Sequence, residues 1–134
     1  MFLTHHFQIT EMISLDNNQL SGSLPIGISA LTALNYFSIH NNNFQGPIPS
    51  DLFYSKSLEY IEIHSNQFTG QLLRFDPNSK IRYLYASNNL ISGTIPDELG
   101  NVTNLEMLYL SNNRFNGTIP KTIMSLSKLY TCKL

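Results

Sequence analysis

The sequence is poor in cysteine, in charge and in long apolar runs. Its 134 residues include a single cysteine, Cys132, which excludes both an internal disulfide and a cysteine-rich metal site. Charged residues make up only 13%, the formal net charge is −1, and lysine and arginine form no run. Nucleic-acid binding by counterion release requires clustered positive charge, so nucleic acid is not expected as a partner.

The longest mostly apolar stretch, LPIGISALTAL at 24–34, is too short to cross a bilayer and contains Pro25 and Gly27. The sequence therefore predicts no membrane segment. The first ten residues have no basic residue before their apolar part, and His5 and His6 interrupt that part, so no signal peptide is expected. The length suits one continuous core rather than two domains.

What the sequence has in abundance is a repeated asparagine–glycine pattern. Nearly the same nine residues occur as NNQLSGSLP at 17–25, NNNFQGPIP at 41–49, NNLISGTIP at 88–96 and NNRFNGTIP at 112–120. The asparagine of each N-x-[apolar]-x-G unit recurs at steps of 24, 24, 23 and 24 residues, at Asn18, Asn42, Asn66, Asn89 and Asn113. A fixed period of this length indicates a solenoid in which each repeat is one coil.

Each marker asparagine is the N of an L-x-x-L-x-L-x-x-N-x-L pattern, which we call the frame. Apolar residues two apart, such as Leu108 and Leu110, point to one side of a strand, and the residue between them points to the other. One coil cannot enclose its own apolar face, so neighbouring coils must stack. The asparagine amide has two donors and one acceptor, which suit hydrogen bonds to the backbone where the chain leaves the strand. We expect the five markers to form a buried ladder.

A glycine follows every marker by four residues, at Gly22, Gly46, Gly70, Gly93 and Gly117. We expect a positive φ at these bends, and the proline that follows fixes an extended approach to the next turn. The third repeat reads SNQFTGQLLRFDPNS, with Leu73 in place of proline and one residue fewer. Its convex side should therefore be irregular.

This frame closely resembles that of the leucine-rich repeat family, and the G-x-I-P after the markers is similar to its plant-specific class. The resemblance runs from about residue 10 to the C-terminus. It implies an α/β solenoid, that is, a right-handed leucine-rich repeat superhelix with a concave parallel β-sheet and convex turns or 3₁₀ segments. Members of the class usually carry paired cysteines at both ends, which this chain lacks. We expect 1–134 to be a single domain or a fragment, with about five full repeats, a partial sixth and an irregular segment at 1–9.

Repeats of this class look like those of receptor-kinase ectodomains, receptor-like proteins and polygalacturonase inhibitors. The resemblance favours a non-catalytic recognition module of a receptor-type protein, extracellular or at the cell surface as part of a longer protein. Two alternatives stay open. One is an inhibitor of a cell-wall-degrading enzyme, and the other is an intracellular scaffold in the cytoplasm.

The frame leaves the outward residues of the strands free, and five of the seven tyrosines fall on them in two adjoining columns. With strands about 4.8 Å apart, Tyr36 and Tyr109 should lie about 15 Å apart, which matches four or five residues of extended peptide. Tyrosine is enriched at interfaces, although its high β-propensity is an alternative explanation. We expect a protein or peptide ligand on this concave face, contacted by Tyr36, Tyr60, Tyr83, Tyr85, Tyr109, His40, His64 and Glu62.

His40 and His64 occupy equivalent positions in adjacent repeats. Two imidazoles without a third ligand make a weak metal site. The sequence therefore predicts no metal, and instead a solvated histidine pair that tunes ligand binding near pH ~6. Glu59 and Glu62 could suggest general acid/base catalysis, but no nucleophile or metal set converges with them, so neither enzyme activity nor a cofactor is expected.

A further column, of Glu59, Arg82 and Glu106, predicts an arginine between two carboxylates. Two N-x-[ST] triplets, at Asn101 and Asn116, are candidate glycosylation sites and should lie in accessible turns.

The two ends of the stack carry their own predictions. Cys132 lies at an inward frame position and should pack as a small hydrophobe. The last predicted strand finishes at Leu134 with an open edge and an uncovered core. We expect the isolated chain to self-associate through its uncapped ends, unless residues 1–9 cover the N-terminal one.

Overall fold

The computed structural model describes residues 9–134. The irregular segment predicted at 1–9, and its proposed folding over the N-terminal end, lie outside the described residues except for Ile9. Ile9 belongs to a turn and is exposed.

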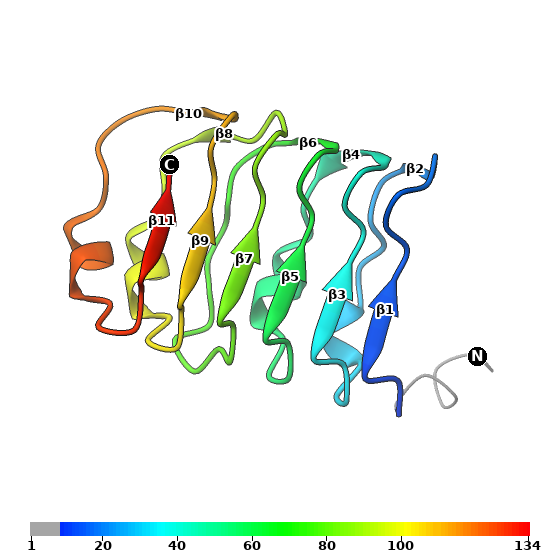
Figure 1. Cartoon of the computed structure of the whole chain (residues 1–134), viewed down its shortest axis with the longest axis horizontal. Coiled ribbons are helices and arrows are strands. Elements are labelled where there is room, and N and C mark those ends of the chain that lie inside the picture. The colour runs from blue at the N-terminus through cyan, green and yellow to red at the C-terminus, as the bar shows by residue number, and fades with distance from the viewer. Residues whose placement is uncertain (1–8) are drawn as a thin grey trace.

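The described chain is a solenoid, and each coil contributes one short strand to a single parallel sheet (Figure 1). The six strands follow one another in chain order, as β1 (Met12–Ser14), β3 (Tyr36–Ser38), β5 (Tyr60–Glu62), β7 (Tyr83–Tyr85), β9 (Met107–Tyr109) and β11 (Thr131–Lys133). The L-x-L part of each frame forms the strand because alternating side chains must reach the core on one side and solvent on the other. The predicted leucine-rich repeat solenoid is confirmed.

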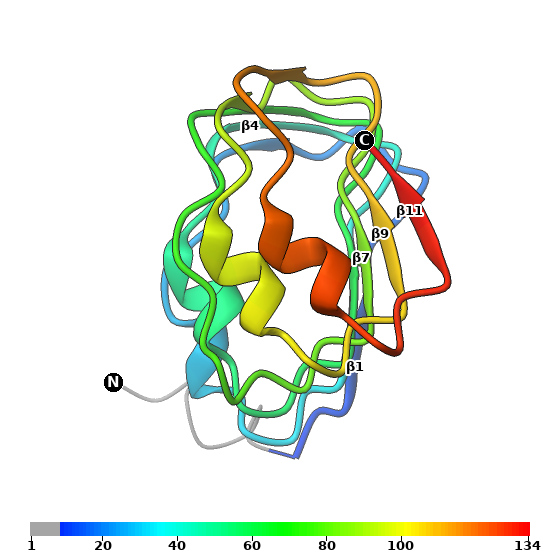
Figure 2. The same cartoon turned by 90° about the vertical axis from the view of Figure 1, so that its left-hand side faces the viewer.

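Four coils of the described chain carry a 3₁₀ segment on the convex side, which lies away from the main sheet (Figure 2). The segments are η1 (Ile28–Ala30), η2 (Ser50–Tyr54), η3 (Asp97–Asn101) and η4 (Lys121–Ser125). A proline directly precedes each of η2, η3 and η4, with φ of −60°, −72° and −60°. The proline ring fixes this angle and so sets the extended entry into each segment.

The third coil has no 3₁₀ segment between Gln71 and Lys80, within the part of the chain that the structure describes. The predicted irregularity is confirmed. Contacts of Phe75 and Asp76 hold this coil in place. The ring of Phe75 packs 4.5 Å from that of Phe53, and the carboxylate of Asp76 accepts a 2.7 Å hydrogen bond from the backbone N–H of Asn78.

Short strands also form where the chain leaves the main sheet, a feature that the repeat pattern did not predict. One sheet contains β2 (Ser21–Gly22), β4 (Asn43–Pro47) and β6 (Gln67–Thr69), and the other pairs β8 (Ser92–Gly93) with β10 (Arg114–Phe115). All five predicted bend glycines have φ between 76° and 94°, as expected. Because every coil bends through the same backbone conformation, the segments around the bends align and pair.

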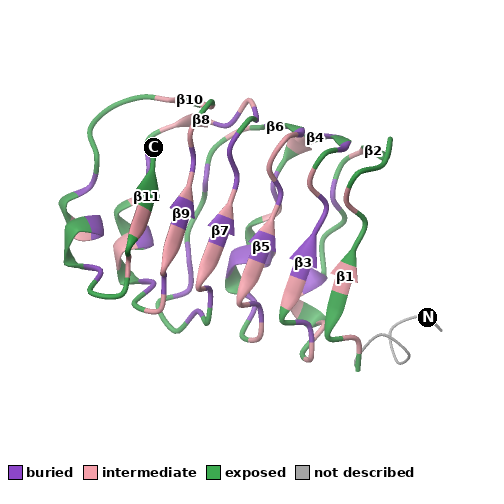
Figure 3. Cartoon of the chain, in the orientation of Figure 1, coloured by how far each residue is buried: buried purple, intermediate pink, exposed green. Residues whose placement is uncertain are grey.

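The core takes buried residues from both the main sheet and the convex side (Figure 3). Inward strand residues such as Phe37, Ile61, Leu84 and Leu108 are buried, each at 4% exposure or less. Packing between equivalent residues of successive coils therefore makes one continuous core.

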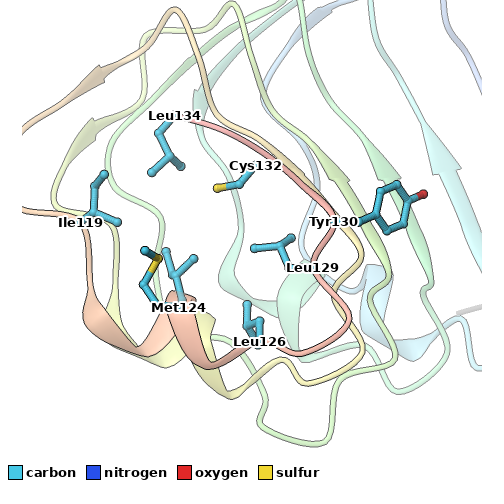
Figure 4. Close-up of a pocket in the computed structure, with 8 residues that line it drawn as sticks. Ile119, Met124, Leu126, Leu129, Tyr130, Cys132 and Leu134 are labelled. Carbon is cyan, nitrogen blue, oxygen red and sulfur yellow. The ribbon is translucent and has the colours of Figure 1, made fainter.

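The C-terminal end of this core is open (Figure 4). A hollow of about 520 Å³ lies there, lined by apolar side chains that include Leu129, Leu134 and Met124. Cys132 points into it but is exposed, so the prediction that it packs as a small hydrophobe is wrong. Its position faces inward, but no further coil of this chain covers it.

Candidate functional site

The strand register places the predicted columns on the sheet. Tyr36 pairs with Tyr60, and Tyr60 with Tyr83. In the adjoining column Glu62 pairs with Tyr85, which pairs with Tyr109. Residues about 24 apart in sequence thus lie on adjacent strands.

The five tyrosines form what we call the tyrosine face: Tyr36, Tyr60, Tyr83, Tyr85 and Tyr109. Tyr36 and Tyr60 have ring centroids 5.7 Å apart, Tyr60 and Tyr83 4.4 Å, and Tyr85 and Tyr109 5.0 Å. All five are half-buried. Burial raises the pKa of Tyr36 and Tyr85 further above the ordinary value of 10.0.

A charged cluster borders the tyrosine face. Arg82 Nε donates a 2.8 Å hydrogen bond to Glu106 Oε1, and Arg82 Nη1 lies 3.5 Å from Glu59 Oε2. The predicted arginine between two carboxylates is confirmed. Tyr83 Oη also donates to Glu106, over 2.9 Å. This hydrogen bond raises the pKa of Tyr83, while those from Arg82 and Tyr83 lower the pKa of Glu106.

A hollow of about 270 Å³ opens beside the second tyrosine column. It is lined by Tyr85 and Tyr109, together with His64, Lys133 and a few small polar residues. Lys133 Nζ lies 4.9 Å from the centre of the Tyr109 ring, a cation–π arrangement that holds the lysine at the rim. The concave face therefore offers both a contiguous aromatic surface and a recess.

The two predicted histidines meet just beyond the strands. The rings of His40 and His64 stack with centroids 4.4 Å apart and planes 9° apart. The sequence predicted a solvated pair, but both histidines are half-buried. The side chains of Asp16 and Glu62 flank the pair. His40 Nε2 lies 3.6 Å from Asp16 Oδ2 and 3.8 Å from Glu62 Oε2. Partial burial, followed by the proximity of His40, lowers the pKa of His64.

The marker asparagines form a scaffold behind this face. Asn42, Asn66 and Asn89 are buried, Asn113 is half-buried and Asn18 is exposed. Asn66 shows the pattern of bonds. Its Nδ2 donates to the carbonyls of Ile39 and Ile63, and its Oδ1 accepts from the Phe44 N–H. The expectation of burial is wrong for Asn18 because no coil described in the structure precedes its own.

A second polar column went unpredicted. The residue before each marker has a positive φ of 53–57°, in the left-handed region, at Asn17, Asn41, Ser65, Asn88 and Asn112. Asn41 donates to Asn17 over 2.9 Å, and Asn112 donates to Asn88 over 2.8 Å. The NN doublet was a usable signal, since asparagine is one of the few residues with a side chain that tolerates this conformation.

The remaining candidates lie away from the concave face. Asn101 ends η3 and Asn116 follows β10, and both are exposed. Among residues 9–134, no helix combines the length and apolar character needed to cross a bilayer.

Comparisons with known proteins agree with this geometry. The family model for leucine-rich repeats in two copies matches residues 79–129, and a single-repeat model matches 10–31 and 33–54. A comparison with curated proteins gave no match.

Among solved structures, the plant peptide hormone receptor RGFR1 in complex with RGF2 is 32% identical, with a TM-score of 0.86 over 92% of this chain. The Arabidopsis receptor kinase HAESA, in complex with the peptide hormone IDA and the co-receptor SERK1, is 27% identical, with a TM-score of 0.89 over 92% of this chain. This chain spans about a fifth of those two receptor chains, 20% and 21%. A plant ice-binding protein is 27% identical, with a TM-score of 0.74, and the match covers 86% of this chain and 38% of the ice-binding protein. On these matches, the chain belongs to the leucine-rich repeat family.

Proposed function

We propose that this chain is a non-catalytic recognition module of a receptor-type leucine-rich repeat protein, and that it binds an extended peptide across the tyrosine face. The observation that carries the proposal is the unbroken ring-to-ring contact of Tyr36, Tyr60 and Tyr83 beside the pair of Tyr85 and Tyr109. The similarity to RGFR1 and HAESA, both solved with peptide hormones, supports the same class of ligand.

The shape of the face suits an extended chain. The tyrosines cover four adjacent strands, β3 to β9, a width of about 15 Å at the usual strand spacing. Tyrosine rings bury a large area and lose few rotamers on binding. The recess beside Tyr85 and Tyr109, which His64 also lines, can receive one side chain of the peptide. Glu62 and His40 supply further polar contacts on the same face.

The charge of the face suggests which peptides fit. Carboxylates outnumber cations on or beside the concave columns, with Glu11, Asp16, Glu59, Glu62 and Glu106 against Arg82 and Lys133. Opposite charges steer association and penalise the wrong partner. The ligand should therefore carry net positive charge.

We also propose that the module acts outside the cell or at its surface, as part of a longer protein. The basis is the likeness to receptor ectodomains many times its length. Exposed Asn101 and Asn116 are then available to a glycan.

The test begins with a displayed library of random peptides of about twelve residues, selected on the isolated chain. Affinity of the selected peptides is then measured for the protein and for its Tyr60→Ala and Tyr83→Ala variants. We expect a loss of at least about tenfold in both, as for aromatic residues at the centre of an interface. Tyr54→Ala is the matched control, because Tyr54 is an exposed tyrosine on the convex side.

Unchanged affinity in both concave variants would overturn the proposal. Selected peptides that are acidic rather than basic would contradict its charge argument alone. Residual activity of a polygalacturonase mixed with the chain tests the alternative of an inhibitor.

A further inference from the structure

We propose that His40, Glu62 and His64 form a binding site for a divalent transition-metal ion of the Zn²⁺ type at the edge of the concave face. The proposal goes beyond peptide recognition. One ligand atom from each of the three residues lies within 4.8 Å of the other two. Two imidazoles alone would bind weakly, and the structure supplies the missing third ligand from the neighbouring column.

The distances are close to those of a metal site. Zinc binds imidazole nitrogen and carboxylate oxygen at about 2.0–2.2 Å in tetrahedral geometry, which separates two ligand atoms by roughly 3.3–3.6 Å. His40 Nε2 lies 3.8 Å from Glu62 Oε2. Side-chain movements of about 1 Å therefore bring the three atoms to coordination distance.

Ion binding requires a turn of the rings. The planes of His40 and His64 are 9° apart, so their in-plane lone pairs run nearly parallel rather than meeting at one point. Rotation about the Cβ–Cγ bond of either ring makes them converge. That rotation gives up the ring stacking but breaks few hydrogen bonds at the Nδ1 atoms. His40 Nδ1 has no hydrogen-bond partner among residues 9–134, and His64 Nδ1 has only a 3.2 Å contact with the Ser65 hydroxyl.

The ligand types select the class of ion. Two histidines and one carboxylate form a zinc-type set that leaves a fourth position open, whereas calcium and magnesium prefer all-oxygen sites. The Asp16 carboxylate lies 3.6 Å from His40 Nε2 and brings a second negative charge to the cluster. Two carboxylates beside two imidazoles complement a doubly charged cation.

The backbone holds these ligands in register. Glu62 is the last residue of β5, and His40 and His64 each follow their strand by two residues. The buried amides of Asn42 and Asn66 donate to the carbonyls of His40 and His64, respectively.

Zinc titration by calorimetry, without peptide, tests the site. The protein should carry His5→Asn, His6→Asn and Cys132→Ser, because two adjacent histidines and an exposed thiol bind zinc by themselves. We expect one ion per chain. His64→Asn and, separately, Glu62→Gln should each weaken binding by at least about tenfold, the loss usual even for residues that only support a ligand.

Glu59→Gln is the matched control, since it neutralises another carboxylate of the same face that is 3.5 Å from Arg82 rather than near a histidine. It should leave zinc affinity unchanged. Cobalt provides a second measurement, because Co²⁺ in a tetrahedral site gives intense visible absorption that His64→Asn should abolish.

Three results would overturn the proposal. They are no zinc binding, zinc binding that survives in the double variant His40→Asn/His64→Asn, and a loss of zinc affinity in Glu59→Gln equal to that in Glu62→Gln. Circular dichroism of each variant separates loss of the site from loss of the fold. Since zinc binding is measured alone, failure here leaves peptide recognition standing, and failure of peptide recognition leaves the metal site standing.

Discussion

The rings of Tyr60 and Tyr83 stack with centroids 4.4 Å apart and planes 16° apart. The two residues lie on β5 and β7, where the parallel register makes them direct partners. The third repeat is one residue shorter than the others, yet its deletion falls on the convex side and leaves this register intact. The aromatic surface is thus continuous across the one irregular coil.

The Tyr60–Tyr83 contact should be measurable as a coupling energy. Aromatic pairs contribute about 0.5–1.5 kcal/mol beyond area burial. A double-mutant cycle of Tyr60→Ala and Tyr83→Ala, followed by urea unfolding, should therefore give a coupling of this size. The control cycle uses Tyr36 and Tyr109, which lie three strands apart and should give additive effects. Equal coupling in the two cycles would contradict direct stacking.

The asparagine ladder should contribute to stability in proportion to burial. Asn66→Ala leaves the Phe44 N–H without its acceptor in a buried site, and it removes one of the two amide donors to the Ile39 carbonyl. The expected loss of unfolding free energy is about 2–4 kcal/mol. Asn18→Ala, in an exposed rung, should cost less than about 1 kcal/mol. Chemical denaturation of both variants measures the difference, and similar losses would show that burial does not set the contribution.

The stability of the irregular third coil should depend on pH through Asp76. Hydrogen bonds from Lys56 and then from the Asn78 N–H lower the pKa of Asp76 below its ordinary value of 3.8. The charged form therefore favours the folded state above the unfolded pKa, and this contribution is lost as pH falls through the lower folded pKa. Asp76→Asn should reduce the melting temperature at pH ~7 and change it less at pH ~3.

The reference for this comparison is Asp97→Asn, which removes an exposed carboxylate from the first turn of η3. A deficit in Asp76→Asn that stayed constant from neutral to acidic pH would show that the charge of Asp76 is not responsible.

Ser65 is the one position in the left-handed column that is not asparagine, with φ of 55°. Asparagine tolerates this conformation better than serine, and in this column it can continue the amide contacts between Asn41 and Asn88. Ser65→Asn should stabilise the fold by roughly 0.5 kcal/mol. The reverse change in the next coil, Asn88→Ser, should destabilise it by a similar amount. Thermal melts of both variants check the pair, and shifts of the same sign would refute the argument.

The open C-terminal end should make the isolated chain self-associate. Met124 is 85% exposed and Ile119 is 56% exposed at the rim of the hollow. Burial of such apolar surface between chains is favourable. Met124→Glu should reduce the apparent mass in light scattering under reducing conditions. Ile26→Glu, which changes an equally exposed residue near the other end of the stack, should reduce it less. A clean monomer at high concentration would refute the prediction.

The repeat frame was enough to predict which residues share a column. The partners of Tyr60 follow from a period of about 24 residues, because stacked coils turn a linear spacing into a spatial one. The positive φ of Gly93 follows from the glycine at the bend, and the irregular coil around Leu73 follows from its departure from the repeat. The two short sheets, of β2, β4 and β6 and of β8 and β10, were not predicted. They arise from alignment of the bends and not from an alternating apolar pattern.

The repeat frame did not predict contacts between residues of different columns. The sequence places His40 and His64 in one column and Glu62 in another, and only the coordinates show the carboxylate 3.8 Å from the imidazole. Lateral contact depends on the rotamers and lengths of the side chains, which a repeat period does not encode.

Periodicity alone therefore determined the coil, the register and the order of side chains along each column of this protein. The tertiary structure decided which columns touch and how far each position is covered, as the exposed inward-facing Cys132 shows. The physical reason is that spacing along a chain determines repetition, whereas burial and side-chain contact depend on the neighbouring coils that pack against each position.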